Sequence, residues 1–276
     1  MDALPIHEQA DVEFRSEIDG KMHACGHDCH TAMLLGAARV LKKNESSIEG
    51  TIKLIFQPAE EGGAGGKMMK EQGVLEKPKV QQIYALHVAG TMPMGTLSSK
   101  EGTLLAATSS IKIVVSGKGG HAAAPHHTID PVVTGSKIIV ELQTLISREL
   151  SPLESGVISI TMVNAGTATN VIPPEMELQG TIRSLTNEGI SQLQTRVKEV
   201  AESIAKANRC EVKVTFPGND YPPTINDAEC WELGKLAAGE ILGKDKVSEM
   251  SSIMGGEDFA YYTQEVPGCF SFIGVG

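Results

Sequence analysis

The sequence predicts a layered α/β protein whose main domain is interrupted by a smaller, ferredoxin-like α+β module. Three observations predict this arrangement. Helical and strand patterns alternate over residues 31–88, the pattern changes near residue 107 to two strand–helix–strand units, and a helix followed by a strand resumes after residue 217. We therefore expect the main domain at residues 1–106 and 218–276, with the inserted module at residues 107–217.

The elements of the main domain follow from hydrophobic periodicity. Residues 31–44 predict a helix because Met33, Leu34 and Leu41 fall on one face at spacings of three and four. Thr51 to Phe56 predicts a strand, because its apolar residues end at a Gln-Pro pair. The other expected elements are a short helix at 67–72, a buried strand at 83–88, a helix at 228–242 and a final strand at 269–275.

The inserted module shows strand and helix patterns in a different order. Its expected strands are at 111–115, 157–163, 175–185 and 211–216, and its expected helices are at 129–150 and 188–207. The resulting order, strand, helix, strand, strand, helix, strand, is the ferredoxin-like order.

Composition excludes two broad classes of function. The chain has 276 residues, with 24 basic and 34 acidic residues and a net charge of −10, which opposes nucleic-acid binding. No apolar run approaches the roughly 20 residues of a membrane span, and the start of the chain lacks a secretory signal pattern. Five scattered cysteines, an odd number, fit free thiols in a reducing compartment, so we expect a cytoplasmic location.

Four short clusters contain residue types that bind transition metals. They are Cys25-Gly26-His27-Asp28, Glu60-Glu61-Gly62-Gly63, Leu86-His87 and Gly255-Gly256-Glu257-Asp258. Thiolate, imidazole and carboxylate together are typical of a transition-metal site rather than of a calcium or magnesium site. Three of these clusters have an alternative: a redox or zinc-ribbon pair at Cys25 and Cys29, a solvated acidic turn at Glu60 and Glu61, and a packed strand end at His87.

The adjacent glutamates predict two different roles. Glu60 and Glu61 follow an expected strand, on a glycine-rich loop that suits a cleft. One glutamate would bind metal, and the other would take a proton from water and return it to a leaving amine. A further glycine-flanked histidine, His121, lies in Gly117-Lys118-Gly119-Gly120-His121. This run lacks the phosphate-loop spacing and indicates a turn that presents His121 as a donor to a substrate oxygen.

The motifs, taken together, resemble a known family along the whole chain. Those that carry the resemblance are Asp2-Ala3-Leu4-Pro5, Gly20 to Asp28, Gln57 to Gly63, Leu86-His87-Val88, Ser116 to Ala123, Asn170-Val171-Ile172-Pro173 and Met254 to Phe259. They resemble the amidohydrolase branch of the aminoacylase/carboxypeptidase metallopeptidases, which contains auxin-conjugate hydrolases, hippurate hydrolases and N-acyl-amino-acid deacylases.

The resemblance implies a catalytic α/β domain with two divalent transition-metal ions, zinc or manganese, and a lid domain that forms a homodimer. It implies hydrolysis of the amide bond of small N-acyl amino acids. The positions that match metal ligands are Cys25, His27, Glu61 and His87, and the position that matches the general base is Glu60. His121 matches a lid residue that acts on substrate, and Asn170 and Arg183 match substrate-binding residues.

Two departures from the family pattern leave alternatives open. Members of this branch have a longer N-terminal segment and a later metal-binding histidine, whereas no histidine follows His127 in this sequence. The sequence is therefore expected to lack both ends, and little activity is expected from it alone. A truncated, non-catalytic protein that dimerises through its lid is one alternative, and a dipeptidase or diaminopimelate-type deacylase is another.

Overall fold

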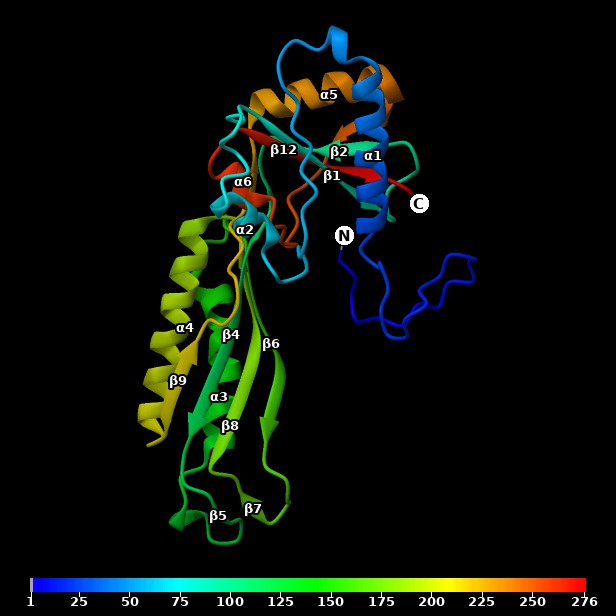
Figure 1. Ribbon diagram of the computed structural model, residues 1–276. Helices are drawn as coiled ribbons and strands as arrows, with labels where there is room; N and C mark the ends of the chain where they lie inside the picture. Colours follow the sequence, from blue (N-terminus) through cyan, green and yellow to red (C-terminus); the bar gives the residue numbers. More distant parts are fainter. Residues whose placement is uncertain (1) are drawn as a thin grey trace. The chain divides into compact units, whose positions relative to one another are not determined.

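The computed structural model describes residues 2–276, which form two compact units. The chain begins in the first unit, passes into the second and returns to the first, and it enters the second again for one short segment before it ends in the first. The first unit runs to Leu104 and continues over Thr224–Ser252 and Glu257–Gly276, and the second comprises Leu105–Pro223 and Ile253–Gly256. Both units combine helices with sheets (Figure 1), so the α/β class predicted from the sequence is confirmed.

The first unit contains a mixed sheet. Strand β12 lies between β1, with which it pairs in parallel, and β2, with which it pairs antiparallel. Strand β11 pairs in parallel with β2 at the other edge, and a short β3–β10 pair lies apart from this sheet. The elements are α1 (His27–Lys43), η1 (Glu45–Ser47), α2 (Gly65–Glu71), β1 (Ile83–Ala89), β2 (Leu97–Ser99), β3 (Gly102–Leu105), β10 (Thr224–Asn226), α5 (Ala228–Leu242), η4 (Lys244–Lys246), β11 (Val247–Glu249), α6 (Ala260–Thr263) and β12 (Gly268–Gly274).

Helix α5 closes one side of this unit. It begins where the Asp227 side chain accepts a hydrogen bond from the backbone N–H of Cys230, at 2.9 Å, as expected of an N-cap aspartate. Its buried Trp231 packs in a cluster with Leu97 of β2 and Cys269 of β12. Capping and apolar burial therefore fix the same helix, and its ends coincide with those predicted from the sequence.

The second unit is a sheet packed against two helices. Strands run in the order β6-β8-β4-β9, all antiparallel to their neighbours, and α3 and α4 pack on each other and on strands of the sheet (Figure 1). The elements are β4 (Ala107–Ser116), β5 (Gly120–His121), η2 (Pro125–His127), α3 (Pro131–Thr144), η3 (Leu145–Glu149), β6 (Gly156–Ala165), β7 (Val171–Ile172), β8 (Glu175–Ser184), α4 (Asn187–Ala207) and β9 (Glu211–Thr215).

The core of the second unit follows from period-two and period-3.6 patterns. Along β4, buried Ile111, Ile113 and Val115 alternate with more exposed residues, as a half-buried strand requires. Leu193 and Val197, four residues apart on α4, join the same apolar cluster. The strand and helix order predicted for residues 107–217 is present here, and β5 and β7 add a short pair.

The strand predicted at residues 51–56 was wrong. This segment is described, but none of its residues pairs in a sheet. It borders a cavity of about 1270 Å³ whose other lining residues include Met33 of α1 and Tyr84 of β1. A strand is defined by its pairing partner as well as by its own sequence, and here the cavity occupies the place beside the segment.

No helix within residues 2–276 is long and apolar enough to cross a membrane. The cytoplasmic location expected from the cysteines stays a prediction.

Candidate metal centre

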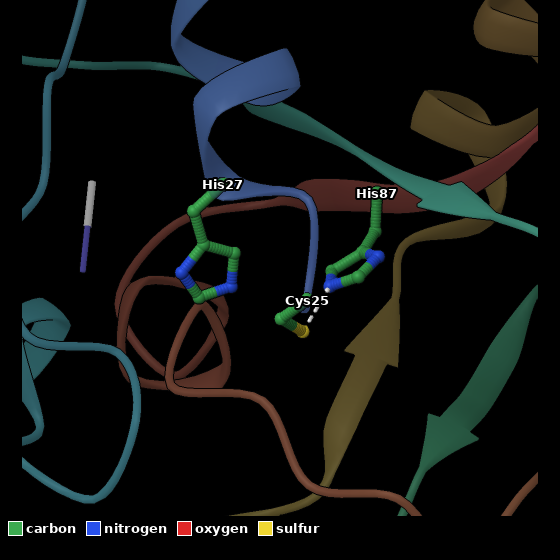
Figure 2. Close-up of side chains that lie close together, drawn as sticks. All are labelled: Cys25, His27 and His87. Carbon is green, nitrogen blue, oxygen red and sulfur yellow. Dashed lines mark hydrogen bonds between the residues drawn. The ribbon is translucent and has the colours of Figure 1, made fainter. Parts of the chain in front are cut away.

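Cys25 and His27 lie on either side of a tight turn at the start of α1. Gly26 between them has φ 89° and ψ 18°, a left-handed conformation that favours glycine. A Cβ atom at Gly26 would lie 2.4 Å from Cγ2 of Val88, so the turn also needs a residue without a side chain. In this turn the Cys25 thiol and the His27 ring both face His87 (Figure 2).

Each of the two histidines has one ring nitrogen fixed by a hydrogen bond. The Nδ1–H group of His27 donates to Oδ1 of Asp2 at 2.9 Å, and that of His87 donates to the carbonyl oxygen of Val88 at 2.7 Å. The Nε2 atoms are the ones left to act as ligands. Nε2 of His87 lies 3.4 Å from the Sγ atom of Cys25 (Figure 2), so thiol and imidazole already converge.

Glu60 and Glu61 lie on the loop before α2. Oε2 of Glu60 is 3.8 Å from Nε2 of His27. The backbone N–H of Glu61 donates to Oδ2 of Asp2 at 2.9 Å, so a single aspartate binds both the His27 ring and the glutamate loop. Residues far apart in the sequence are therefore held together at one point.

Two overlapping groups of side chains could hold a metal ion. The ligand atoms of Cys25, His27 and His87 lie within 4.8 Å of one another, and so do those of His27, Glu60 and Glu61. His27 belongs to both groups. The four residues that the sequence predicts as metal ligands thus lie in one cluster of the first unit, next to Glu60, the predicted base.

The local electrostatics favour a bound cation. Burial, together with the nearby Glu61 carboxylate, raises the pKa of the Cys25 thiol to about 12. Burial and the charges of Asp258 and Glu61 raise the pKa of Glu60 to about 8. Both shifts disfavour the negatively charged forms in this partly dry space, and a bound cation would offset them and favour the thiolate form of Cys25.

A third group brings Glu60 together with two acidic residues, Glu257 and Asp258, that come much later in the sequence. The carboxylates of Glu60, Glu257 and Asp258 lie within 4.8 Å of one another, and Glu257 and Asp258 are buried. Burial raises the pKa of both Glu257 and Asp258. In the sequence, Glu257 and Asp258 belong to one of the four clusters of metal-binding residue types. The sequence assigns no separate role to either residue.

The sequence did not identify Asp2 as a site residue. The signal was present, since Asp2 begins one of the motifs that carry the family resemblance. Its contacts with His27 and Glu61 span 25 and 59 residues of the chain, so only the folded structure reveals them.

The predicted substrate-contacting residues belong to the second unit. His121 ends β5, which pairs with β7, and the backbone N–H of Ala122 donates to the carbonyl oxygen of Asn170 at 3.0 Å. His121 and Asn170 are therefore neighbours within this unit. Arg183 is elsewhere, on β8, where its half-buried guanidinium donates to the carbonyl oxygen of Met254 at 3.4 Å.

Comparison with known proteins agrees with the fold and with the chemistry of this cluster. The sequence profile of peptidase family M20/M25/M40 matches residues 1–276. An IAA-amino acid hydrolase ILR1-like protein of Arabidopsis thaliana is 46% identical over 278 residues, covering 100% of this chain and 63% of that protein. The N-acetylcysteine deacetylase of Bacillus subtilis is 41% identical, covering 100% of this chain and 71% of its own length.

A solved structure of another protein is also similar to this chain over almost its whole length. A dinuclear metal-binding peptidase of Bacillus subtilis matches with a TM-score of 0.83 and 36% identity, covering 99% of this chain and 69% of that one. The chain thus spans a little under two thirds of the length of the plant relative, and the match extends from its first residue to its last. On this evidence the chain belongs to peptidase family M20/M25/M40.

Proposed function

We propose that the protein is a metal-dependent amidohydrolase that cleaves the amide bond of N-acyl amino acids. The observation that carries the proposal is the convergence of Cys25, His27 and His87 beside the Glu60–Glu61 pair. Relatives that match the whole chain act on amides of this kind: one is an IAA-amino acid hydrolase and another an N-acetylcysteine deacetylase.

The donor set fits divalent transition-metal ions. Cys25, His27, Glu61 and His87 would hold two such ions, with zinc or manganese the expected metals, and the dinuclear bacterial relative supports that number. Both histidines already have their Nδ1 atoms occupied, so Nε2 is presented in each case. When bound, the metal ions supply Lewis-acid polarisation of the scissile carbonyl and make water more acidic.

Glu60 is the proposed proton carrier. One of its carboxylate oxygens takes a proton from the attacking water, and the same oxygen then delivers that proton to the nitrogen of the leaving amine. Burial and neighbouring carboxylates raise the pKa of Glu60 to about 8. That value applies to the metal-free protein, and a bound cation beside Glu60 would lower it, which favours the carboxylate form that accepts a proton.

The second unit is proposed to supply substrate contacts and the dimer interface. His121 would donate to the substrate oxygen that becomes negatively charged, within the site of a partner subunit, and Asn170 beside it would bind substrate. Arg183 is the proposed partner of the substrate carboxylate. The support for His121 is its place at the end of a short strand, next to Asn170.

A substrate panel tests the proposal. A full-length form of the protein is used for this and every other activity measurement. It would be stripped with a chelator, reloaded with zinc or manganese, and assayed on hippurate, an indoleacetyl amino acid, N-acetyl-diaminopimelate and a dipeptide. We expect turnover of N-acyl amino acids that disappears with chelation and returns with metal. Hydrolysis of the dipeptide alone would instead support a dipeptidase. Metal binding without turnover of any substrate would contradict the proposal and support a non-catalytic protein.

A further inference from the structure

The loop that carries the two glutamates folds back tightly on itself. The backbone N–H of Gly65 donates to the carbonyl oxygen of Ala59 at 3.1 Å, and a Cβ atom at Gly65 would lie 1.6 Å from the carbonyl oxygen of Pro58. Ala59 and Ala64 have φ 57° and φ 51°, which is unfavourable for residues other than glycine. A loop of this shape needs contacts from outside to hold it.

Asp258 provides those contacts at both ends of the loop. Its Oδ1 atom accepts a hydrogen bond from Nε2 of Gln57 at 2.6 Å, and its Oδ2 atom accepts one from the backbone N–H of Gly66 at 2.8 Å. Gln57 is fixed in turn, because its Oε1 atom accepts from the hydroxyl of Tyr262 at 2.9 Å. Asp258 is fully buried, so water does not compete for either of its oxygen atoms.

The main chain of Asp258 also contacts the proposed base directly. The Glu60 carboxylate accepts a hydrogen bond from the backbone N–H of Asp258. A Cβ atom at Gly66 would lie 2.6 Å from the carbonyl oxygen of Asp258, so the two backbones touch where the loop enters α2. One residue therefore binds the Glu60 side chain and both ends of the loop from which it projects.

We propose that Asp258 is a positioning residue for Glu60, which holds the carboxylate of the base in place through hydrogen bonds to residues 57, 60 and 66. The proposal rests on the proposed role of Glu60 as general base. Both carboxylate oxygens of Asp258 are already bound to N–H groups of the protein, so this role differs from that of a metal ligand. What the loop needs from Asp258 is the geometry of its hydrogen bonds, not its charge.

Two substitutions separate geometry from charge. Asp258→Ala removes both acceptors, so kcat should fall by about 10–100-fold while KM and metal content stay within a few-fold of the wild-type values. In Asp258→Asn, the new amide oxygen can accept from Gly66, and its NH₂ group can donate to Gln57 once the Gln57 amide has rotated. The hydroxyl oxygen of Tyr262 can then accept from Gln57, so kcat should stay within a few-fold of wild type.

A matched control lies in the second unit. The side chain of Asp130 also accepts from two N–H groups, those of Val132 and Val133 at 2.8 and 3.2 Å, at the start of α3. Asp130→Ala should lower thermal stability while leaving kcat unchanged below the melting temperature. This control separates loss of stability from loss of positioning.

The proposal is overturned if Asp258→Asn is as inactive as Asp258→Ala, since charge or metal ligation would then be what matters. It is also overturned if Asp258→Ala keeps wild-type kcat or loses its metal. Crystal structures of both variants give a readout that does not depend on turnover. Displacement of Glu60 in Asp258→Ala, but not in Asp258→Asn, supports the proposal even if no substrate is found, whereas an unmoved Glu60 in Asp258→Ala contradicts it.

Discussion

Asp2 accepts a hydrogen bond from His27 through one carboxylate oxygen and a hydrogen bond from the backbone of Glu61 through the other, at 2.9 Å in each case. Two proposed metal ligands are thus oriented by one side chain. The surroundings of Asp2 also change its pKa. Burial disfavours the charged carboxylate, but the hydrogen bonds from the Glu61 N–H and the His27 ring outweigh the effect of burial, so the pKa of Asp2 is lowered. Asp2 should therefore be ionised when metal binds.

Removing this aspartate should weaken metal binding. In Asp2→Ala, the His27 ring loses the acceptor that fixes Nδ1, and the Glu61 backbone loses its partner. We expect metal affinity to fall by about 10–100-fold, measured by competition with a chelator. Asp19→Ala is a matched control because Asp19 also pairs with a histidine, His7, but at an exposed position. A similar loss of affinity in both variants would show that Asp2 has no special role.

The turn between Cys25 and His27 should depend on glycine. In Gly26→Ala, the new methyl group would meet the Val88 side chain at 2.4 Å, in a backbone conformation that already disfavours alanine. Gly50→Ala is the control, since Gly50 has φ 116° but open space around it. Both variants should lose about 1–3 kcal/mol of unfolding free energy, whereas only Gly26→Ala should also lose metal affinity. Equal metal affinity in the two variants would contradict the steric argument.

His30 should make the metal-free protein sensitive to acid. Burial and the nearby His87 and His27 lower its pKa from 6.5 to about 4, and its Nε2 atom accepts a hydrogen bond from the Val88 backbone at 3.0 Å. The folded state disfavours the protonated ring, so its contribution to stability is complete above about pH 6.5 and is lost as the pH falls toward 4.

Urea unfolding of the chelator-treated protein at pH 7.5 and pH 5 checks this. A glutamine at position 30 can place its amide oxygen where Nε2 of His30 lies and so still accept from Val88, but it does not titrate. The His30→Gln variant should therefore lose less stability between the two pH values than the wild type does. His126→Gln, at an exposed histidine, should behave like the wild type. The account of His30 fails if wild type and His30→Gln lose stability equally.

A mixing experiment tests the proposed role of His121 across a dimer. His121→Ala and Glu60→Gln should each be inactive alone. After subunit exchange, half of the dimers are mixed and each holds one intact site, so about a quarter of the wild-type activity should return. Mixed dimers confirmed by mass, yet without activity, would place His121 and Glu60 in the same subunit's site.

Local patterns in the sequence were sufficient where an element is determined by its own residues. Helix α5 was predicted with its correct ends, and in the structure Asp227 caps its start. Strand β4 was predicted over residues 111–115, and buried residues alternate with more exposed ones along the whole observed strand. The segment 51–56 has an equally good strand pattern, but pairing depends on a neighbour, and here a cavity lies beside it. A local pattern carries no information about that neighbour.

The candidate site shows the same contrast between residues that the sequence reveals and residues that only the fold reveals. The residues predicted as metal ligands were marked by their chemical type and by family motifs, and the structure gathers them. Asp2 and Asp258 act through contacts that cross 25 to 201 residues of sequence. The sequence placed Asp258 in a cluster of metal-binding residue types and did not single out Asp2, and it identified the partners of neither. Residues that orient others are found only when the fold brings their partners beside them.

The division of roles between Glu60 and Glu61 is the most direct test of the whole account. The measurement is metal content and kcat, in parallel, for Glu60→Gln and Glu61→Gln in the metal-loaded protein. Glu60→Gln should keep its metal and lose about 10²–10⁴-fold in kcat, because proton transfer is removed while the ligands stay. Glu61→Gln should lose metal. Loss of metal in Glu60→Gln, with metal retained in Glu61→Gln, would contradict the assignment of base and ligand.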